Sequence, residues 1–165
     1  MHADLKANVA HWDDDDEVAG YLERVVRKQA FDKTGLIYGM GHAVYTKSDP
    51  RAVILKRFAS QLAEGTEFEA EFRLLETVER LAPEVLRTVK GTEKEICANV
   101  DMYSGFVYSM MGIPEDLYTP LFACARMAGW AAHRFEEIYS AKRIIRPAYK
   151  TTFARPRAYI PIDER

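Results

Sequence analysis

Two short segments contain the residue types that acid–base chemistry on a carboxylate substrate requires. Residues 39–51 place His42 directly after a glycine-containing turn, and residues 99–105 place Asp101 at the start of an apolar run. A neutral imidazole can donate a hydrogen bond to a carbonyl oxygen, and a carboxylate can remove a proton from carbon. Arg51 adds a guanidinium that can bind a carboxylate through two parallel hydrogen bonds. The two segments together therefore predict an enzyme site.

Each of these residues also has an ordinary structural explanation. His42 can be a loop residue whose ring bonds to the backbone, and Arg51 a surface arginine in a helix that Asp49 caps and Pro50 begins. Asp101 is either the N-cap of the helix that follows it or a functional carboxylate. Partial burial against its apolar neighbours would favour the functional role. The sequence leaves these alternatives open.

Ordered motifs extend along nearly the whole chain, at residues 35–45, 48–51, 99–108, 112–114, 120–133 and 145–147. In this order they resemble the C-terminal part of the citrate synthase family. The resemblance implies condensation of acetyl-CoA with oxaloacetate, followed by hydrolysis of the thioester to citrate and CoA. It implies no prosthetic group and no metal, with acetyl-CoA as a co-substrate.

The resemblance also implies roles for individual residues. His42 resembles the histidine that polarises the oxaloacetate carbonyl, and Asp101 the aspartate that removes a methyl proton from acetyl-CoA. Arg51 and Arg126 resemble arginines that bind the dicarboxylate, and Arg146 resembles the one that reaches the neighbouring subunit's site. The residues that match the CoA-binding part of the family are Gly41, Ala43 and Asn99. We expect the imidazole and the carboxylate to converge on a common cleft bordered by arginines.

One motif of the family does not occur in this sequence. Its second catalytic histidine lies in a His-Gly-Gly-Ala-Asn stretch, and neither His2 nor His11 has a glycine beside it. We interpret both histidines as surface residues on or near an N-terminal helix. Loss of one preorganised hydrogen-bond donor costs about 100- to 1,000-fold in rate. We therefore expect a fragment, or one half of a split enzyme, that is inactive without the missing large domain.

Length, charge and cysteine content limit the class of protein. The 165 residues carry a net charge of -2 without a basic face, which disfavours nucleic acid as a partner. Cys97 and Cys124 lack metal-ligand spacing and indicate a reducing compartment. For Cys97 we favour a packing role, and the alternative is a thiol near the site, because Cys97 is close to Asp101 in the sequence. No apolar run approaches the ~20 residues of a membrane span, and the N-terminus lacks a signal-peptide core. These features predict a cytoplasmic protein.

Apolar residues recur at helical spacing, which predicts an all-α, multi-helical fold. The expected helices start at residues 13–17, at Pro50 with an end near Gly65, near Phe68 with a restart or bend at Pro83, at Asp101 with a stop at Gly112 and Pro114, and at residues 119–120 with an end near Tyr139. We divide the chain into a small helical domain, residues 1–112, that carries His42 and Asp101. Residues 113–165 are expected to form a long helix and an extended tail.

The last expected helix is rich in alanine and glycine, which allows close helix approach. This helix packs either against other helices of the same chain or, as the resemblance implies, across an interface. The partner at that interface would be a second copy of this chain, in a homodimer, or a complementing large-domain chain. Three alternatives to a citrate synthase remain. They are a 2-methylcitrate synthase, which needs room for one more methyl group, a lyase acting on citryl-CoA, and a non-catalytic helical assembly module with a decayed site.

Overall fold

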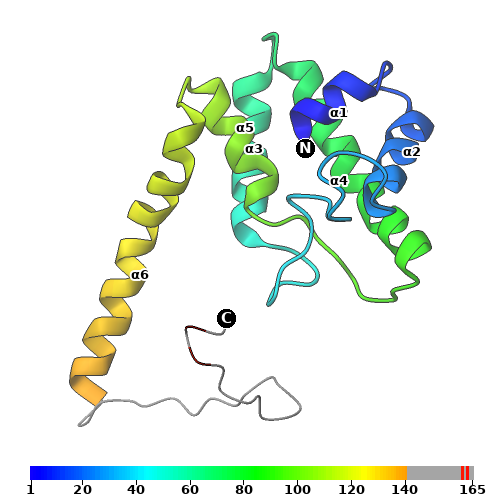
Figure 1. The fold of residues 1–165 in the computed structure, drawn as a ribbon. Coiled ribbons are helices and arrows are strands. Elements are labelled where there is room, and N and C mark those ends of the chain that lie inside the picture. Colours follow the sequence, from blue (N-terminus) through cyan, green and yellow to red (C-terminus); the bar gives the residue numbers. More distant parts are fainter. Residues whose placement is uncertain (141–160, 162, 164–165) are drawn as a thin grey trace. The chain divides into compact units, whose positions relative to one another are not determined.

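The structure is a computed structural model that describes residues 1–140, 161 and 163. The helices of this part are α1 (His2–Asn8), α2 (Asp15–Val26), α3 (Pro50–Ala63), α4 (Glu69–Lys90), α5 (Asp101–Met110), the short 3-10 helix η1 (Glu115–Leu117) and α6 (Tyr118–Ser140) (Figure 1). No β-strand occurs among the described residues, apart from a single antiparallel bridge between Met40 and Ala98. The prediction of an all-α fold is confirmed.

The chain divides into two compact units, Met1–Leu121 and Phe122–Arg165. This boundary falls inside α6, nine residues after the one that the sequence suggested between 112 and 113. The predicted boundary is the end of the small domain in the family, whereas these units are defined by compactness. The boundary at residue 112 therefore stays a prediction, and the two units are described separately.

Helix α4 is the centre of the first unit. Figure 1 shows α2 on one side of α4, and α3 with α5 on the other. The side chains that α4 buries are Phe72, Leu74, Leu75, Val78, Ala82 and Leu86. They follow helical spacing along one face, so a single amphipathic helix supplies packing surface to all of its neighbours. Full burial of one such large side chain contributes about 1.5 to 3 kcal/mol.

Local signals mark several helix ends. The Asp14 carboxylate caps α2 by accepting hydrogen bonds from the backbone nitrogens of Asp16 and Glu17, at 2.9 and 3.2 Å. Asp49 caps α3 in the same way, and Pro50 occupies the first turn. Gly91 follows α4 with a φ of 62°, the left-handed conformation that commonly ends a helix.

Pro83 does not restart the chain path, because α4 continues through it as one helix. Proline lacks the N–H that would bond to the carbonyl of Glu79, four residues earlier. Ala82 and Leu86, which precede and follow Pro83 in the sequence, are both buried in the core. Tertiary packing therefore offsets the lost hydrogen bond. The predicted restart considered only the local effect of proline on a helix.

The interpretation of His2 as a surface residue was wrong. Its side chain is half-buried, and burial, helped by the positive charge of the chain's amino terminus, lowers the pKa of its imidazole to about 4. His11 is exposed as expected, with its Nδ1 3.0 Å from the Glu17 carboxylate. The sequence did not distinguish the two histidines, because the burial of His2 depends on how the start of α1 packs in the folded chain.

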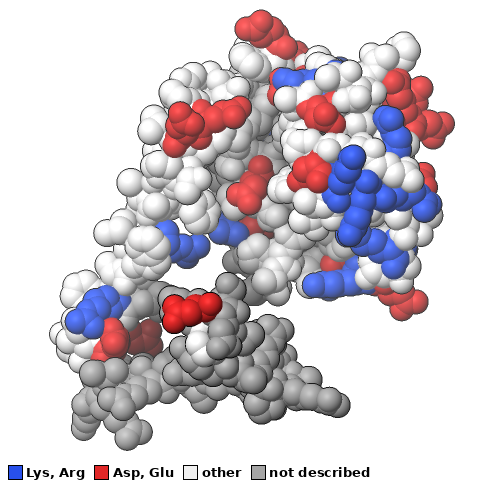
Figure 2. Space-filling view, in the orientation of Figure 1, with Lys and Arg blue, Asp and Glu red and all other residues white. Residues whose placement is uncertain are grey.

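The second unit contains α6 from Phe122 onward. None of the residues of this helix is buried, although it carries large apolar side chains. Those that are exposed include Phe122, Met127, Trp130, Phe135, Ile138 and Tyr139. None of the helices in residues 1–140 is long and apolar enough to cross a membrane. On the first unit, Figure 2 shows acidic and basic side chains together on the visible face.

Candidate active site

Two segments far apart in the sequence are joined by backbone hydrogen bonds at the site. The nitrogen of Gly41 donates to the carbonyl oxygen of Cys97 at 2.8 Å, and the nitrogen of Asn99 donates to that of Gly39, also at 2.8 Å. These bonds hold the loop that carries His42 against the start of α5. The structure thus brings together the two segments whose residue types suggested chemistry.

Gly39 allows this close approach. It has a φ of +88°, and a Cβ at this position would lie 2.8 Å from the Cα of Met102. Both the conformation and the space exclude an ordinary side chain. The Asn99 side chain adds two further bonds, one from its Nδ2 to the Gly41 carbonyl at 2.8 Å and one to its Oδ1 from the Asp101 nitrogen at 2.9 Å. The Asn99 amide therefore links the loop to the first turn of α5.

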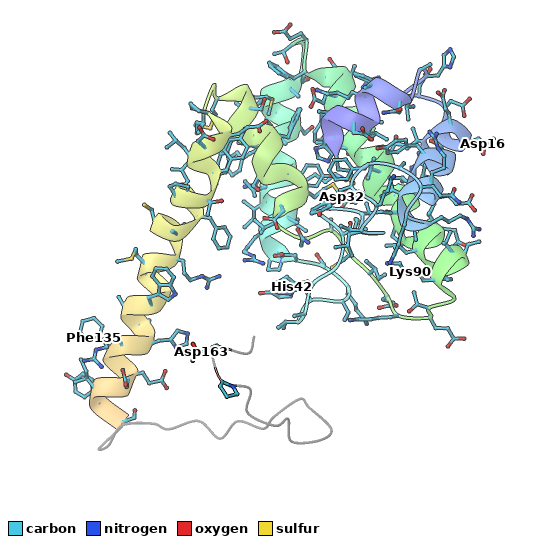
Figure 3. All side chains as sticks on the ribbon, viewed as in Figure 1. Asp16, Asp32, His42, Lys90, Phe135 and Asp163 are labelled. Carbon is cyan, nitrogen blue, oxygen red and sulfur yellow. The ribbon has the colours of Figure 1, made fainter. Side chains whose placement is uncertain are left out.

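The hydrogen bonds of His42 determine which of its nitrogens can act on a ligand. Its Nδ1 accepts from the backbone nitrogens of Val44 and Tyr45, at 3.0 and 3.1 Å. In the neutral ring the proton is then on Nε2, as this network assigns it. The side chain is partly exposed, and Figure 3 shows it on the loop that leads into α3. His42 therefore presents a hydrogen-bond donor.

Arg51 lies beside this donor. Its Nη2 is 3.4 Å from the Nε2 of His42, and its Nε and Nη2 donate to the Asp49 carboxylate at 3.0 and 2.8 Å. Since both Nη2 and Nε2 carry hydrogens, they do not bond to each other. Two donors at this separation can instead bond to a single oxygen atom of a ligand.

Asp49 has a second role in addition to the helix capping that the sequence indicated. It is 1% exposed, and hydrogen bonds from the Arg51 guanidinium, above all, hold the pKa of its carboxyl below the usual range. Sequence reasoning missed this pairing. The available signal was the Asp-Pro-Arg order, because a carboxylate at a helix cap lies close to the side chain that begins the first turn.

Asp101 is the exposed first residue of α5. The N-cap of this helix is Val100, without a side-chain cap, so the capping interpretation of Asp101 was wrong. The partial burial that we considered is not found either. Its carboxylate makes no hydrogen bond or ion pair with any residue of the range 1–140. The pKa of Arg51 is raised chiefly by Asp49 and, to a lesser extent, by the negative charge of Asp101.

Arg126, Arg146, Ala43 and Cys97 are the other residues that the sequence analysis considered for the site. Arg126 lies in the second unit, exposed on α6, with its guanidinium carbon 5.8 Å from the centre of the Phe122 ring. Arg146 lies outside the described residues. Ala43 is exposed in the His42 loop. The Sγ of Cys97 is 3.7 Å from the carbonyl oxygen of Tyr45 and its thiol has a pKa raised by burial, which agrees with a packing role.

His42, Arg51 and Asp101 lie at the surface of the first unit, the first two partly exposed and Asp101 exposed. One hollow of this unit, about 420 Å³ in volume, is lined by Leu62, Thr66, Glu67, Phe68, Met110 and Met111, and includes none of the residues discussed above. Within residues 1–140, no group of three or more His, Cys, Asp or Glu side chains is arranged to hold a metal ion. The chemistry that these contacts support is hydrogen bonding to an anionic or carbonyl oxygen.

Fold and site together define an all-α domain in which a histidine Nε2 and an arginine Nη2 lie 3.4 Å apart on a loop and the helix that follows it. A family model described as "Citrate synthase, C-terminal domain" matches residues 3–148. A citrate synthase from Acidithiobacillus ferridurans is 40% identical over 151 residues, which are 90% of this chain and 36% of that protein. A citrate synthase from Haloferax volcanii is 37% identical over 167 residues, covering 100% of this chain and 41% of the relative. The chain belongs to the citrate synthase family.

Similarity extends to a solved structure and to a second named activity. The crystal structure of citrate synthase from Thermotoga maritima matches with a TM-score of 0.65 and 30% identity, covering 99% of this chain and 42% of that one. A 2-methylcitrate synthase from Shewanella oneidensis is 38% identical over 129 residues, 78% of this chain and 32% of the relative. The chain spans well under half the length of these proteins.

Proposed function

We propose that this chain is the C-terminal part of a citrate synthase, which condenses acetyl-CoA with oxaloacetate to give citrate and CoA. The observation that carries the proposal is the pair of donors at His42 Nε2 and Arg51 Nη2, 3.4 Å apart, with the histidine tautomer determined by two backbone N–H groups. Such a pair can bind the oxygen of a ketone and an adjacent carboxylate. Oxaloacetate contains both groups on neighbouring carbons.

The chemistry divides between two residues of this chain. The Asp101 carboxylate removes a proton from the methyl group of acetyl-CoA, and the resulting carbon nucleophile attacks the ketone carbon of oxaloacetate. His42 donates to the ketone oxygen as negative charge develops there, which lowers the barrier because the donor is already oriented. Water then cleaves the citryl thioester, which releases citrate and CoA.

The remaining site residues are assigned to binding the dicarboxylate and CoA. Arg126 and Arg146 are proposed to bind the dicarboxylate and to reach a neighbouring subunit, while Gly41, Ala43 and Asn99 contact CoA. The donor for the thioester oxygen has no match in this sequence, so a large-domain segment would supply it. We further propose a cytoplasmic location and assembly as a homodimer through α6, whose large apolar side chains are exposed.

A second candidate is the corresponding part of a 2-methylcitrate synthase. It is favoured by the 38% identity to the Shewanella oneidensis enzyme of that name. Propionyl-CoA differs from acetyl-CoA by one methylene, which a pocket discriminates by roughly 1 to 3 kcal/mol. Comparing kcat/KM for the two thioesters would decide between them. A non-catalytic assembly module is the third candidate and predicts no turnover under any condition.

The experiment that tests the proposal follows the release of CoA thiol from acetyl-CoA and oxaloacetate. The chain is assayed alone, and again with the large-domain segment of a related citrate synthase added as a separate polypeptide. Turnover that requires both polypeptides supports the proposal. No turnover with both present, when they are shown to associate, would favour the assembly module.

Asp101→Asn should reduce turnover of the complemented enzyme by about 100-fold or more, because amide nitrogen cannot act as the base. The Tm of thermal unfolding should stay unchanged, since the Asp101 carboxylate bonds to no residue in the range 1–140. Asp16→Asn is the matched control, an exposed acidic residue in the first turn of α2. His42→Ala should also lower turnover, and unchanged kinetics would remove His42 from the mechanism.

A further inference from the structure

Asp49 has an unusual environment for a helix-capping residue. Within residues 1–140 it is the one charged side chain that is buried, with 1% of its surface exposed. Removing a carboxylate from water costs several kcal/mol unless it is paired and hydrogen-bonded. Asp14, which caps α2, is exposed and accepts only backbone hydrogen bonds. Capping alone therefore does not explain why Asp49 is buried.

Both oxygens of Asp49 are used by Arg51. Oδ1 accepts from the backbone nitrogen and from Nε, each at 3.0 Å, and Oδ2 accepts from Nη2 at 2.8 Å. A guanidinium has five N–H groups in a rigid plane. Asp49 thus occupies one edge of the guanidinium and leaves the Nη1 hydrogens and one Nη2 hydrogen for another acceptor. The Nη2 that is shared between these two edges lies 3.4 Å from His42 Nε2.

We propose that Asp49 is a positioning residue, which orients the Arg51 guanidinium so that its unoccupied edge and the Nε2–H of His42 face the same ligand. The identity of that ligand, a carboxylate with a ketone on the neighbouring carbon, rests on the proposed function. The arginine side chain has several rotatable bonds, and without the carboxylate it would sample orientations that separate it from His42. Asp49 acts through Arg51 and touches no ligand itself.

The first test measures the orientation of Arg51 in the full chain without any ligand. The variants are Asp49→Ser, which keeps an oxygen for the cap, Asp49→Asn, which is isosteric, and Asp14→Ser as the capping control. Hydrogen exchange of the Arg51 Nε–H is followed by nitrogen-15 NMR, and Arg51→Lys identifies the resonance. We expect exchange about 10- to 100-fold faster in both Asp49 variants and unchanged in Asp14→Ser, because only Asp49 bonds to the guanidinium.

The second test measures kinetics of the complemented enzyme. Asp49→Ser and Asp49→Asn should raise the KM for oxaloacetate by about 10- to 100-fold and leave the KM for acetyl-CoA unchanged. Partial unfolding would instead reduce the amount of active enzyme and change neither KM. Asp14→Ser should match the unmodified chain in both constants.

Equal exchange rates in the unmodified chain and in Asp49→Asn would overturn the inference, as would a KM for oxaloacetate that stays unchanged in both Asp49 variants. If Asp49→Ser does not fold, Asp49→Asn decides both tests, since it retains the capping oxygen and the size of the side chain. If the unmodified chain shows no turnover after complementation, the proposed function fails, and the exchange measurement alone decides the role of Asp49.

Discussion

Gly39 is a position where a larger side chain would not fit. A methyl group there would lie 2.8 Å from the Met102 Cα, with φ at +88°. We expect Gly39→Ala to destabilise the fold by at least about 2 kcal/mol, because neither the loop nor the first turn of α5 can move without breaking the hydrogen bonds between them. Unfolding in urea measures this difference.

Gly20 is the matched control. It lies inside α2, and a Cβ at this position would meet nothing within 4 Å. Gly20→Ala should therefore stabilise the protein by up to about 1 kcal/mol through helix propensity alone. Equal effects of the two substitutions would show that the contact between the loop and α5 is not as tight as described.

His2 makes the stability depend on pH. Burial, with a smaller contribution from the chain's amino terminus, lowers its pKa from an unfolded value of 6.5 to about 4. Between these two values the unfolded state binds a proton at His2 and the folded state does not, so stability falls as pH is lowered from about 6.5 towards 4. His2→Gln should remove this part of the pH dependence in urea unfolding. His11→Gln, at an exposed ring, should leave it, and the same slope in both variants would contradict the assignment.

Helix α4 contains a proline in its interior, where proline normally destabilises a helix. Pro83 removes the hydrogen bond to the Glu79 carbonyl in the middle of a 22-residue helix. Pro83→Ala should restore that bond and raise the free energy of unfolding by as much as about 3 kcal/mol. Pro50→Ala is the control, because Pro50 is in the first turn of α3, where the missing N–H would have no helical partner. A stabilisation at Pro50 equal to that at Pro83 would contradict this explanation.

Three helices meet at one polar cluster that positions α5. The Lys56 ammonium of α3 bonds to Glu79 of α4 at 2.8 Å and lies 3.3 Å from the Glu76 carboxylate. The hydroxyl of Tyr103, a fully buried residue of α5, donates to Glu79 as well. Burial, followed by this hydrogen bond, raises the pKa of the Tyr103 phenol. The cluster thus ties α5, which begins with Asp101, to the two helices that pack against it.

At the scale of the whole molecule, the first unit contains the core that the structure describes. Its buried apolar residues lie between Leu5 and Val107, and α6 buries none. A chain that ends at Leu121 should therefore fold and unfold cooperatively, with a Tm within a few degrees of the full chain. Differential scanning calorimetry measures both.

A shorter chain that ends at Gly91 is the contrasting variant. It loses α5 and with it the buried side chains of Met102, Tyr103, Phe106 and Val107. We expect no cooperative transition, because each of these large apolar groups contributes about 1.5 to 3 kcal/mol when buried. If the chain that ends at Gly91 folds, or the chain that ends at Leu121 does not, the core is not where the structure places it.

The sequence by itself determined the helices and the family. Asp14, Asp49, Pro50 and Gly91 act through hydrogen bonds and dihedral angles within a few residues, so their effects are legible in the local order of residues. The motifs at residues 39–51 and 99–105 carried the resemblance to citrate synthases, which the matching family model confirms. The catalytic roles of His42 and Asp101 stay predictions.

Only the tertiary structure decided which groups meet. Three features depend on packing between distant segments: the hydrogen bond from Asn99 to Gly39, the burial of Asp49 against Arg51, and the continuation of α4 through Pro83. The partial burial of His2 at the start of α1 is a fourth. These contacts form because they lower the free energy of the whole folded core. The local spacing of residues along the sequence accounts for only part of that free energy. For that reason the residue types of the site were visible in the sequence, whereas the bonds that orient them were not.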